Sequence, residues 1–280
     1  MIHFTKMQGL GNDYIYVNCF QETVENPEAF SRFISDRHFG CGSDGLILIL
    51  PSSKADFRMR MFNADGSEGR MCGNGVRCVA KYVYDYGLTC KTTVTLETLG
   101  GIKILNMTLG PDGKVALVRV DMGKAELAPA SIPVLSPGPD FIHQPVEVGG
   151  ETVCLTCVSM GNPHAVAFVE DPMALDLEKI GPLYENHPLF PDRINTEFIH
   201  VLDPHTIQMR VWERGSGETM ACGTGACASV VACTLRGFCP RGEDITVKLR
   251  GGDVVINYQE DGTVFMTGPA VTIFDGVIDF

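Results

Sequence analysis

The sequence lacks the long apolar runs and the basic clusters that mark several common classes of protein. Its 280 residues contain no stretch of about 18 apolar residues, the length that a membrane-spanning helix needs, and the N-terminal segment has no apolar middle region like that of a signal peptide. Lysine and arginine total 22 against 34 acidic residues, which gives a formal net charge of -12. These features argue against a nucleic-acid or membrane partner and favour a cytoplasmic protein.

Motifs for common cofactors are also missing. The chain has neither a P-loop nor a complete GxGxxG, and no lysine can be recognised as a site for pyridoxal phosphate. Cys154 and Cys157 form a CxxC without a second such pair, whereas a structural zinc site takes four ligands at set spacing. Eleven cysteines are too few for a disulfide scaffold, and in a reducing compartment most are small buried groups. We therefore expect neither a cofactor nor a metal.

What the sequence does contain is a repeat with an offset of 150 residues. Met71-Cys-Gly-Asn-Gly75 matches Ala221-Cys-Gly-Thr-Gly225, so Cys72 and Cys222 occupy equivalent positions. The segments that also match at this offset are 59–63 with 209–213, 11–12 with 161–162, and Gly87 with Gly237. A segment rich in proline separates the two copies. The sequence predicts two pseudo-symmetric domains, residues 1–119 with 270–280, and residues 120–269.

The pattern of each copy predicts an α/β (α+β) domain, in which a mostly antiparallel sheet or barrel wraps around a central helix. The helices are expected over 27–38, 74–86, 173–184 and 224–236. Strands are expected over 13–20, 45–50, 57–63, 153–158, 164–169, 197–202 and 206–213, with hairpins turning near 100, 112, 251 and 261. The run 271–280 is expected to return to the sheet of the first domain. The helix after Cys222 is apolar around most of its circumference, which is typical of a helix buried on all sides.

The two cysteines suggest proton transfer at one carbon. A helix N-terminus lowers the pKa of a cysteine, and both thiols directly precede a predicted helix. The glycines beside them, Gly73 with Gly75 and Gly223 with Gly225, let backbone N–H groups approach a carboxylate. With one thiol on each side of the α-carbon, a proton could leave from one face and return on the other, which inverts the centre. The active site is then expected in the cleft between the domains.

Other interpretations of these residues stay open at this stage. A nucleophilic cysteine would need a histidine base, for which His164 is the best-placed candidate. A metal or redox module could instead use the cysteines Cys72, Cys78, Cys222 and Cys227. Polar candidates also have structural explanations: asparagine after glycine is a common turn residue, and neighbouring Glu213 and Arg214 could form a solvated pair. His164 could equally be a core histidine with satisfied hydrogen bonds.

The motifs together resemble those of the diaminopimelate epimerase family of cofactor-independent epimerases. They span essentially the whole chain and comprise Gly9-Leu-Gly-Asn-Asp-Tyr14, Met71-Cys-Gly-Asn-Gly75, Met160-Gly-Asn-Pro-His164, Arg193-Ile-Asn195, Trp212-Glu-Arg-Gly215 and Ala221-Cys-Gly-Thr-Gly225. Proline racemases look similar around their cysteines, but they usually carry histidine in place of Asn74 and lack the Trp-Glu-Arg-Gly segment. A racemase of another amino acid is the alternative within this fold.

The resemblance implies a reaction and a set of site residues. The substrate would be LL-diaminopimelate and the product its meso form, used for lysine and peptidoglycan, with no cofactor and with a homodimer as the common assembly. Cys222 would abstract the proton in the LL-to-meso direction and Cys72 would donate it, while His164 and Glu213 would tune the thiols. The substrate-binding groups would be Asn12, Asn63, Gly73, Asn74, Asn162, Asn195, Glu213, Arg214, Gly223 and Thr224. Arg214 would reach the distal carboxylate, and Glu213 the distal ammonium.

One position departs from a common family pattern. Many members have glutamine where this chain has Gly45, although others have glycine. Gly45 matches Asn195 in the repeat, so the missing side chain removes one expected substrate contact from the first half.

Overall fold

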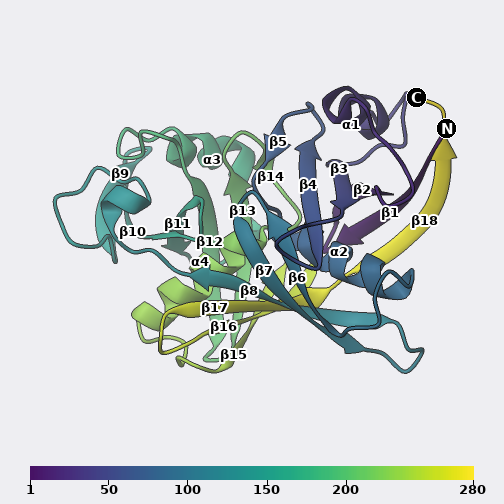
Figure 1. Ribbon diagram of the computed structural model, residues 1–280. Coiled ribbons are helices and arrows are strands. Elements are labelled where there is room, and N and C mark those ends of the chain that lie inside the picture. Colours follow the sequence, from purple (N-terminus) through teal and green to yellow (C-terminus); the bar gives the residue numbers. More distant parts are fainter. The chain divides into compact units, whose positions relative to one another are not determined.

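The computed structural model describes residues 1–280 and divides into two compact units. Unit 1 comprises Met1–Asp121 and Thr267–Phe280, and unit 2 comprises Met122–Met266. Figure 1 shows both units built mainly from strands, each with one helix enclosed among them. The mixed α/β class that the sequence predicts is confirmed. No helix has the length and apolar character that crossing a bilayer requires.

Unit 1 consists of a sheet with one helix on each of its faces. Its elements are β1 (Ile2–Gly9), β2 (Asn12–Asn18), α1 (Pro27–Ser35), β3 (Gly45–Leu50), β4 (Phe57–Asn63), β5 (Glu68–Gly69), α2 (Gly73–Asp85), β6 (Thr93–Thr98), β7 (Gly101–Leu109), β8 (Val115–Lys124) and β18 (Val271–Ile278). Strand β18 pairs antiparallel with β1, so the end of the chain lies in the sheet of unit 1. The two ends of the chain lie close together, since the Met1 amino group is 3.7 Å from the Asp279 carboxylate (Figure 1).

Apolar side chains on both faces of β3 explain the position of the two helices in unit 1. Leu46 and Leu48 point toward α1 and pack in one cluster with Phe30 and Ile34. Ile47 alternates with them and lies against the first turn of α2, as expected for neighbours along a strand. A strand buried on both faces reads as a continuous apolar run, which is the pattern of Gly45–Leu50.

Unit 2 repeats this arrangement. Its elements are η1 (Pro129–Ser131), β9 (Gln144–Val148), β10 (Glu151–Ser159), β11 (Pro163–Phe168), η2 (Pro172–Ala174), α3 (Leu177–Glu185), β12 (Asn195–Asp203), β13 (Thr206–Glu213), β14 (Gly217–Glu218), α4 (Gly223–Leu235), β15 (Asp244–Leu249), β16 (Gly252–Tyr258) and β17 (Thr263–Pro269), which extends into unit 1. Helix α3 covers one face of the sheet, where Phe198 and Trp212 belong to the same apolar cluster as residues of this helix. Helix α4 contacts β10, β11, β12, β15 and β16, so the sheet curves around it.

The strand registers of the two units coincide at the 150-residue offset. Tyr14 pairs with Gly45 in parallel strands β2 and β3, and His164 pairs with Asn195 in β11 and β12. The following antiparallel pairs agree in the same way, because β3 with β4 matches β12 with β13. Helices α2 and α4 begin and end at equivalent residues. The sequence repeat therefore reflects a repeated fold.

Some predicted boundaries differ from the structure for local reasons. The first helix ends at Ser35 rather than at residue 38, because Asp36 leaves the helical conformation and its carboxylate accepts the backbone N–H groups of His38 and Phe39. The helix predicted from residue 173 begins at Leu177, after a short 3-10 turn. The pattern analysis did not predict strands β1 and β9, or the two-residue strands β5 and β14.

Candidate functional site

Cys72 is the N-cap of helix α2 in unit 1. Its backbone is extended, and its sulfur accepts the N–H of Gly75 at 3.4 Å, which is the bond that a capping side chain makes to the first turn. The thiol also donates to Oδ1 of Asn12 at 3.2 Å, and the same oxygen lies 3.5 Å from Nδ2 of Asn74. Cys72, Asn12 and Asn74 are thus brought together at the end of one helix.

Asp44 holds Asn12 in this position. One of its carboxylate oxygens accepts Nδ2 of Asn12 at 2.8 Å and the backbone N–H of Asp13 at 3.0 Å. Burial raises the pKa of Asp44, and the nearby Asp13 carboxylate adds to the effect. The hydrogen bond to the Asp44 carboxylate therefore holds the Asn12 amide with its oxygen toward Cys72.

The fully buried Arg77 supports the same helix end, and sequence reasoning missed it. Its guanidinium donates to Oδ1 of Asn74 at 3.0 Å, to the Gly73 carbonyl at 3.3 Å and to the Pro269 carbonyl at 3.1 Å. A buried arginine fixes several acceptors at once through its planar set of donors. The available signal was a charged residue on the buried stripe of the predicted helix.

Cys222 is the N-cap of helix α4 in unit 2, in the same geometry as Cys72. Its sulfur accepts the N–H of Gly225 at 3.4 Å and lies 3.5 Å from the hydroxyl of Thr224. The thiol is buried, and this burial raises its pKa well above the ordinary value, helped by the carboxylates of Glu213 and Glu197. For Cys222 the helix terminus therefore does not give the lowered pKa expected from the sequence, because desolvation outweighs the helix dipole.

Glu213 ends strand β13 beside Cys222. Its carboxyl accepts the hydroxyl of Thr219 at 2.5 Å and also interacts with the Cys222 thiol. Burial raises the pKa of Glu213 above the usual range for glutamate. A thiol and a carboxyl group are thus held next to each other in desolvated surroundings.

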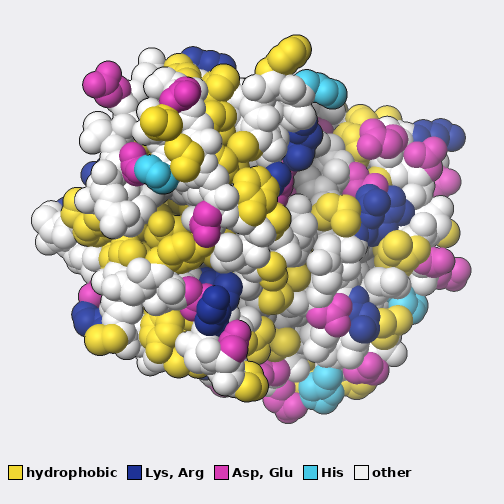
Figure 2. All heavy atoms as spheres, turned by 90° about the vertical axis from the view of Figure 1, so that its right-hand side faces the viewer, with side chains coloured by type: hydrophobic (Ala, Val, Ile, Leu, Met, Phe, Trp, Pro, Cys, Tyr) yellow, Lys and Arg dark blue, Asp and Glu magenta, His cyan; other side chains and the backbone are white.

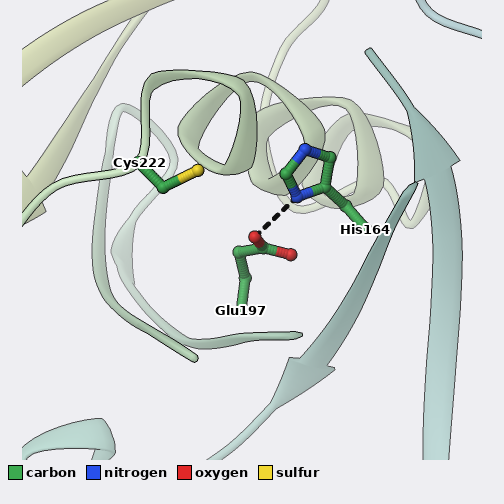
Figure 3. Close-up of side chains that lie close together, drawn as sticks. All are labelled: His164, Glu197 and Cys222. Atoms are coloured by element: carbon green, nitrogen blue, oxygen red, sulfur yellow. Dashed lines mark hydrogen bonds and ion pairs between the residues drawn. The ribbon is translucent and has the colours of Figure 1, made fainter. Parts of the chain in front are cut away.

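His164 and Glu197 form a buried pair next to the same cysteine. Figure 3 shows the Glu197 carboxylate between His164 and Cys222, with Nδ1 of the imidazole 2.7 Å from Oε1. Both side chains are 0% exposed, and one ligand atom from each of the three residues lies within 4.8 Å of the others. This group contains one of the four cysteines of the metal-module alternative. Sequence reasoning missed Glu197, although an acidic residue inside an apolar strand was visible.

The remaining candidates of unit 2 are linked by amide hydrogen bonds. Oδ1 of Asn162 lies 3.1 Å from Nε2 of His164. Nδ2 of Asn162 donates to the hydroxyl of Thr224 at 3.2 Å. Asn195 donates to the Pro163 carbonyl at 2.9 Å and accepts the backbone N–H of Arg214 at 3.0 Å. Asn195 therefore positions the backbone of the segment that carries Arg214.

Asn63 and Gly45 lie opposite each other on β4 and β3. Asn63 is exposed and donates to Ser67 at 3.0 Å, so no hydrogen bond in unit 1 ties it to Cys72. At Gly45 a Cβ atom would lie 2.0 Å from the Phe62 carbonyl oxygen and 2.8 Å from the Tyr14 ring. A side chain such as glutamine would require the backbone to move there, which gives a steric reason for glycine.

Comparisons with known proteins agree with this geometry. The family model described as diaminopimelate epimerase matches residues 4–128 and 156–273. A diaminopimelate epimerase from Acetivibrio thermocellus is 59% identical and covers 99% of both chains, and one from Methanococcus maripaludis (strain C5) is 56% identical, also over 99% of both.

A solved structure shows the same fold at low sequence identity. It is a hydroxyproline epimerase from Agrobacterium vitis, with a TM-score of 0.73 and 15% identity, covering 98% of this chain and 91% of its own. At this identity the likeness concerns the fold alone, whereas the family model and the two close relatives cover nearly all of the chain. The chain belongs to the diaminopimelate epimerase family of isomerases.

Proposed function

We propose that this protein interconverts LL- and meso-2,6-diaminopimelate by proton transfer between two cysteines, Cys72 and Cys222. The observation that carries the proposal is the matched pair of N-caps, because each unit presents one thiol at the start of an enclosed helix. Inversion at one carbon needs a proton acceptor on one face and a donor on the other. One thiol from each unit supplies both groups, and the small-molecule substrate lies between them.

The first turns of the two helices would hold the reacting carboxylate. The first four N–H groups of a helix have no partner within it, and the helix dipole favours negative charge there. In this proposal the backbone N–H groups of Gly73, Asn74, Gly223 and Thr224 bind the carboxylate. The same groups stabilise the enolate-like charge that develops when the α-proton leaves.

Glu213 would tune the protonation of Cys222, the base of this reaction. Burial raises the pKa of both groups, and the Glu213 carboxylate adds to the rise at the Cys222 thiol. In the LL-to-meso direction the Cys222 thiolate then abstracts the α-proton, and Cys72 donates a proton to the opposite face. The hydrogen bond from Cys72 to Asn12 supports the thiol form of this donor.

The distal amino-acid end would be recognised by Asn12, Asn63, Asn162, Asn195, Glu213 and Arg214. The Arg214 guanidinium donates to the Asp192 carbonyl at 2.8 Å, and this donor set suits a carboxylate. The second role of Glu213 is to pair with the distal ammonium. Two charged contacts at the distal end would separate diaminopimelate from proline, which has no second carboxylate or ammonium group.

Incubation with LL-diaminopimelate in deuterated water tests the proposal. We expect meso product labelled at one α-carbon, without added cofactor, and no turnover of L-proline or trans-4-hydroxy-L-proline. A preparation that epimerises proline and leaves diaminopimelate unchanged would support the alternative racemase. A preparation that does neither would contradict both.

We further propose a homodimer in the cytoplasm. Large apolar side chains are exposed along β18 of unit 1, namely Val271, Ile273, Phe274 and Val277, and a second copy of the chain would cover them. Figure 2 shows exposed apolar groups interspersed with charged ones on the face that it presents. All eleven cysteines are free, which suits a reducing compartment. Light scattering coupled to gel filtration should give twice the mass of one chain, and a monomer would contradict the dimer.

A further inference from the structure

Glu197 is a buried carboxylate whose hydrogen bonds are only half satisfied. Oε1 is 2.7 Å from Nδ1 of His164, whereas Oε2 has no hydrogen-bond partner, and the side chain is 0% exposed. Burying a carboxylate is costly unless it is paired and its oxygens are hydrogen-bonded. Stability alone therefore gives no reason to keep this group.

Unit 1 shows that the fold does not need an acid at this place. The residue equivalent to Glu197 is Ile47, in the same register of the matching strand. Both side chains fill the space beneath the first turn of a cysteine helix. A Cβ on Gly75 would lie 2.7 Å from Cδ1 of Ile47, and one on Gly225 would lie 2.4 Å from Oε1 of Glu197. An aliphatic side chain thus fills this space in unit 1. The carboxylate in unit 2 is therefore not required for packing, which indicates a different role.

A chain of hydrogen bonds links Glu197 to the sulfur of Cys222. It passes from His164 Nε2 to Asn162 at 3.1 Å, from Asn162 to the Thr224 hydroxyl at 3.2 Å, and from that hydroxyl to the Cys222 sulfur at 3.5 Å. Figure 3 shows the start of this chain, with the imidazole held by the carboxylate beside the cysteine.

The carboxylate fixes the imidazole ring at the start of this chain. A carboxylate only accepts, so Nδ1 of His164 donates to Glu197. The other ring nitrogen, Nε2, then faces Asn162, whose side-chain amide lies between the ring and the Thr224 hydroxyl. The Thr224 hydroxyl is the last group before the sulfur of Cys222.

We propose that Glu197 is a positioning residue that holds the ring of His164, and through it keeps the side chains of Asn162 and Thr224 in place beside the sulfur of Cys222. Its effect on turnover rests on the proposed function, while its effect on His164 does not. Unit 1 has Tyr14 and Ile47 at the positions of His164 and Glu197, so it lacks this pair of a histidine and a carboxylate. The two thiols are therefore supported differently despite their matched caps.

The test replaces Glu197 by the residue of the other unit, Glu197→Ile, and by Glu197→Gln, whose amide oxygen can still accept from Nδ1. Asp85→Asn is the control, since it alters another largely buried carboxylate at the far end of α2. The readouts are the imidazole ¹⁵N NMR signals of His164, kcat and KM. We expect E197I to lose the signal of the Nδ1–H and to lower kcat about ten- to a hundredfold with KM changed less than about threefold. E197Q should restore most of both, and D85N should leave both unchanged.

An unchanged His164 spectrum in E197I, or a kcat within about twofold of an active wild type, would overturn the inference. If E197I does not fold, Glu197→Met has a similar length and serves for the same readouts. If the wild type itself does not epimerise diaminopimelate, the proposed function fails. The NMR comparison, which needs no substrate, then decides the role of Glu197 by itself.

Discussion

Cys72 and Cys222 make the same hydrogen bond in two different units: each sulfur accepts the N–H of the glycine three residues later at 3.4 Å. Serine is among the preferred N-cap residues, so Cys72→Ser and Cys222→Ser should keep their helices. A hydroxyl is a far weaker acid and base than a thiol. We expect each variant to lower epimerisation by about a hundredfold or more, with an unchanged unfolding midpoint.

Cys233→Ala is the control for these variants, because Cys233 is buried within α4 and lies outside the proposed site. Its kcat should stay close to that of the wild type even if its unfolding midpoint falls. Full activity in either serine variant would exclude that cysteine from the chemistry.

Glu213→Gln should make Cys222 more reactive toward alkylation. The Glu213 carboxylate is one of the groups that raise the pKa of this thiol, so its removal favours the thiolate at a given pH. Iodoacetamide labelling between pH 7 and 9, followed by peptide mass spectrometry, measures both cysteines in one sample. Cys72 serves as the internal reference. Slower labelling of Cys222 in the variant would show that Glu213 does not oppose its ionisation.

Each unit has an arginine–glutamate ion pair at equivalent positions, and the two ion pairs differ in burial. Arg60 with Glu68 and Arg210 with Glu218 are both 2.7 Å apart, but the first side chains are 33% and 29% exposed and the second 11% each. Arg210 also donates to three carbonyls of the segment before α3. In urea unfolding, Arg210→Met should lose about 3 kcal/mol or more and Arg60→Met less than about 1 kcal/mol. Equal losses would contradict the assignment of the difference to burial.

Stability should fall in alkali because of buried thiols such as Cys78. Burial raises the pKa of Cys78 to about 11, whereas in the unfolded chain it is about 8.5. Above pH 8.5 the unfolded state therefore binds fewer protons, and the unfolding free energy decreases by about 1.4 kcal/mol per pH unit up to pH 11. Cys78→Ala should reduce this slope, measured by urea titrations, while Cys90→Ala at an exposed position should not. Identical slopes in both variants would rule out this contribution.

Local patterns in the sequence predicted much of the fold. The apolar run of β3 and the alternation of β4 gave their bounds, and the even apolar character of α4 indicated a helix enclosed by a sheet. The position of the last run beyond the second copy indicated a further strand in the sheet of the first domain, whereas its partner β1 was not predicted. The ends of α1 and α3 were less predictable, because side-chain capping and a short 3-10 turn decide them.

The site was predictable where the two copies agree and less so where they differ. The repeat located both cysteines and the glycines beside them, and the family motifs added the asparagines, His164, Glu213 and Arg214. Glu197 and Arg77 were not predicted as site residues, because the equivalent residue in the other copy is of a different type, Ile47 and Cys227 respectively. Their importance depends on partners distant in sequence, which only the packing of the strands and helices reveals.

Oxidation of the protein without substrate tests the central claim most directly, namely that the sulfurs of Cys72 and Cys222 approach one carbon from two sides. Groups that flank one carbon come close enough to form a disulfide when the site is empty and closes. After treatment with diamide, peptide mapping should show Cys72 joined to Cys222, with activity lost and then restored by dithiothreitol, and saturating substrate should prevent the bond. Full oxidation that leaves activity intact and never links these two cysteines would contradict the shared site.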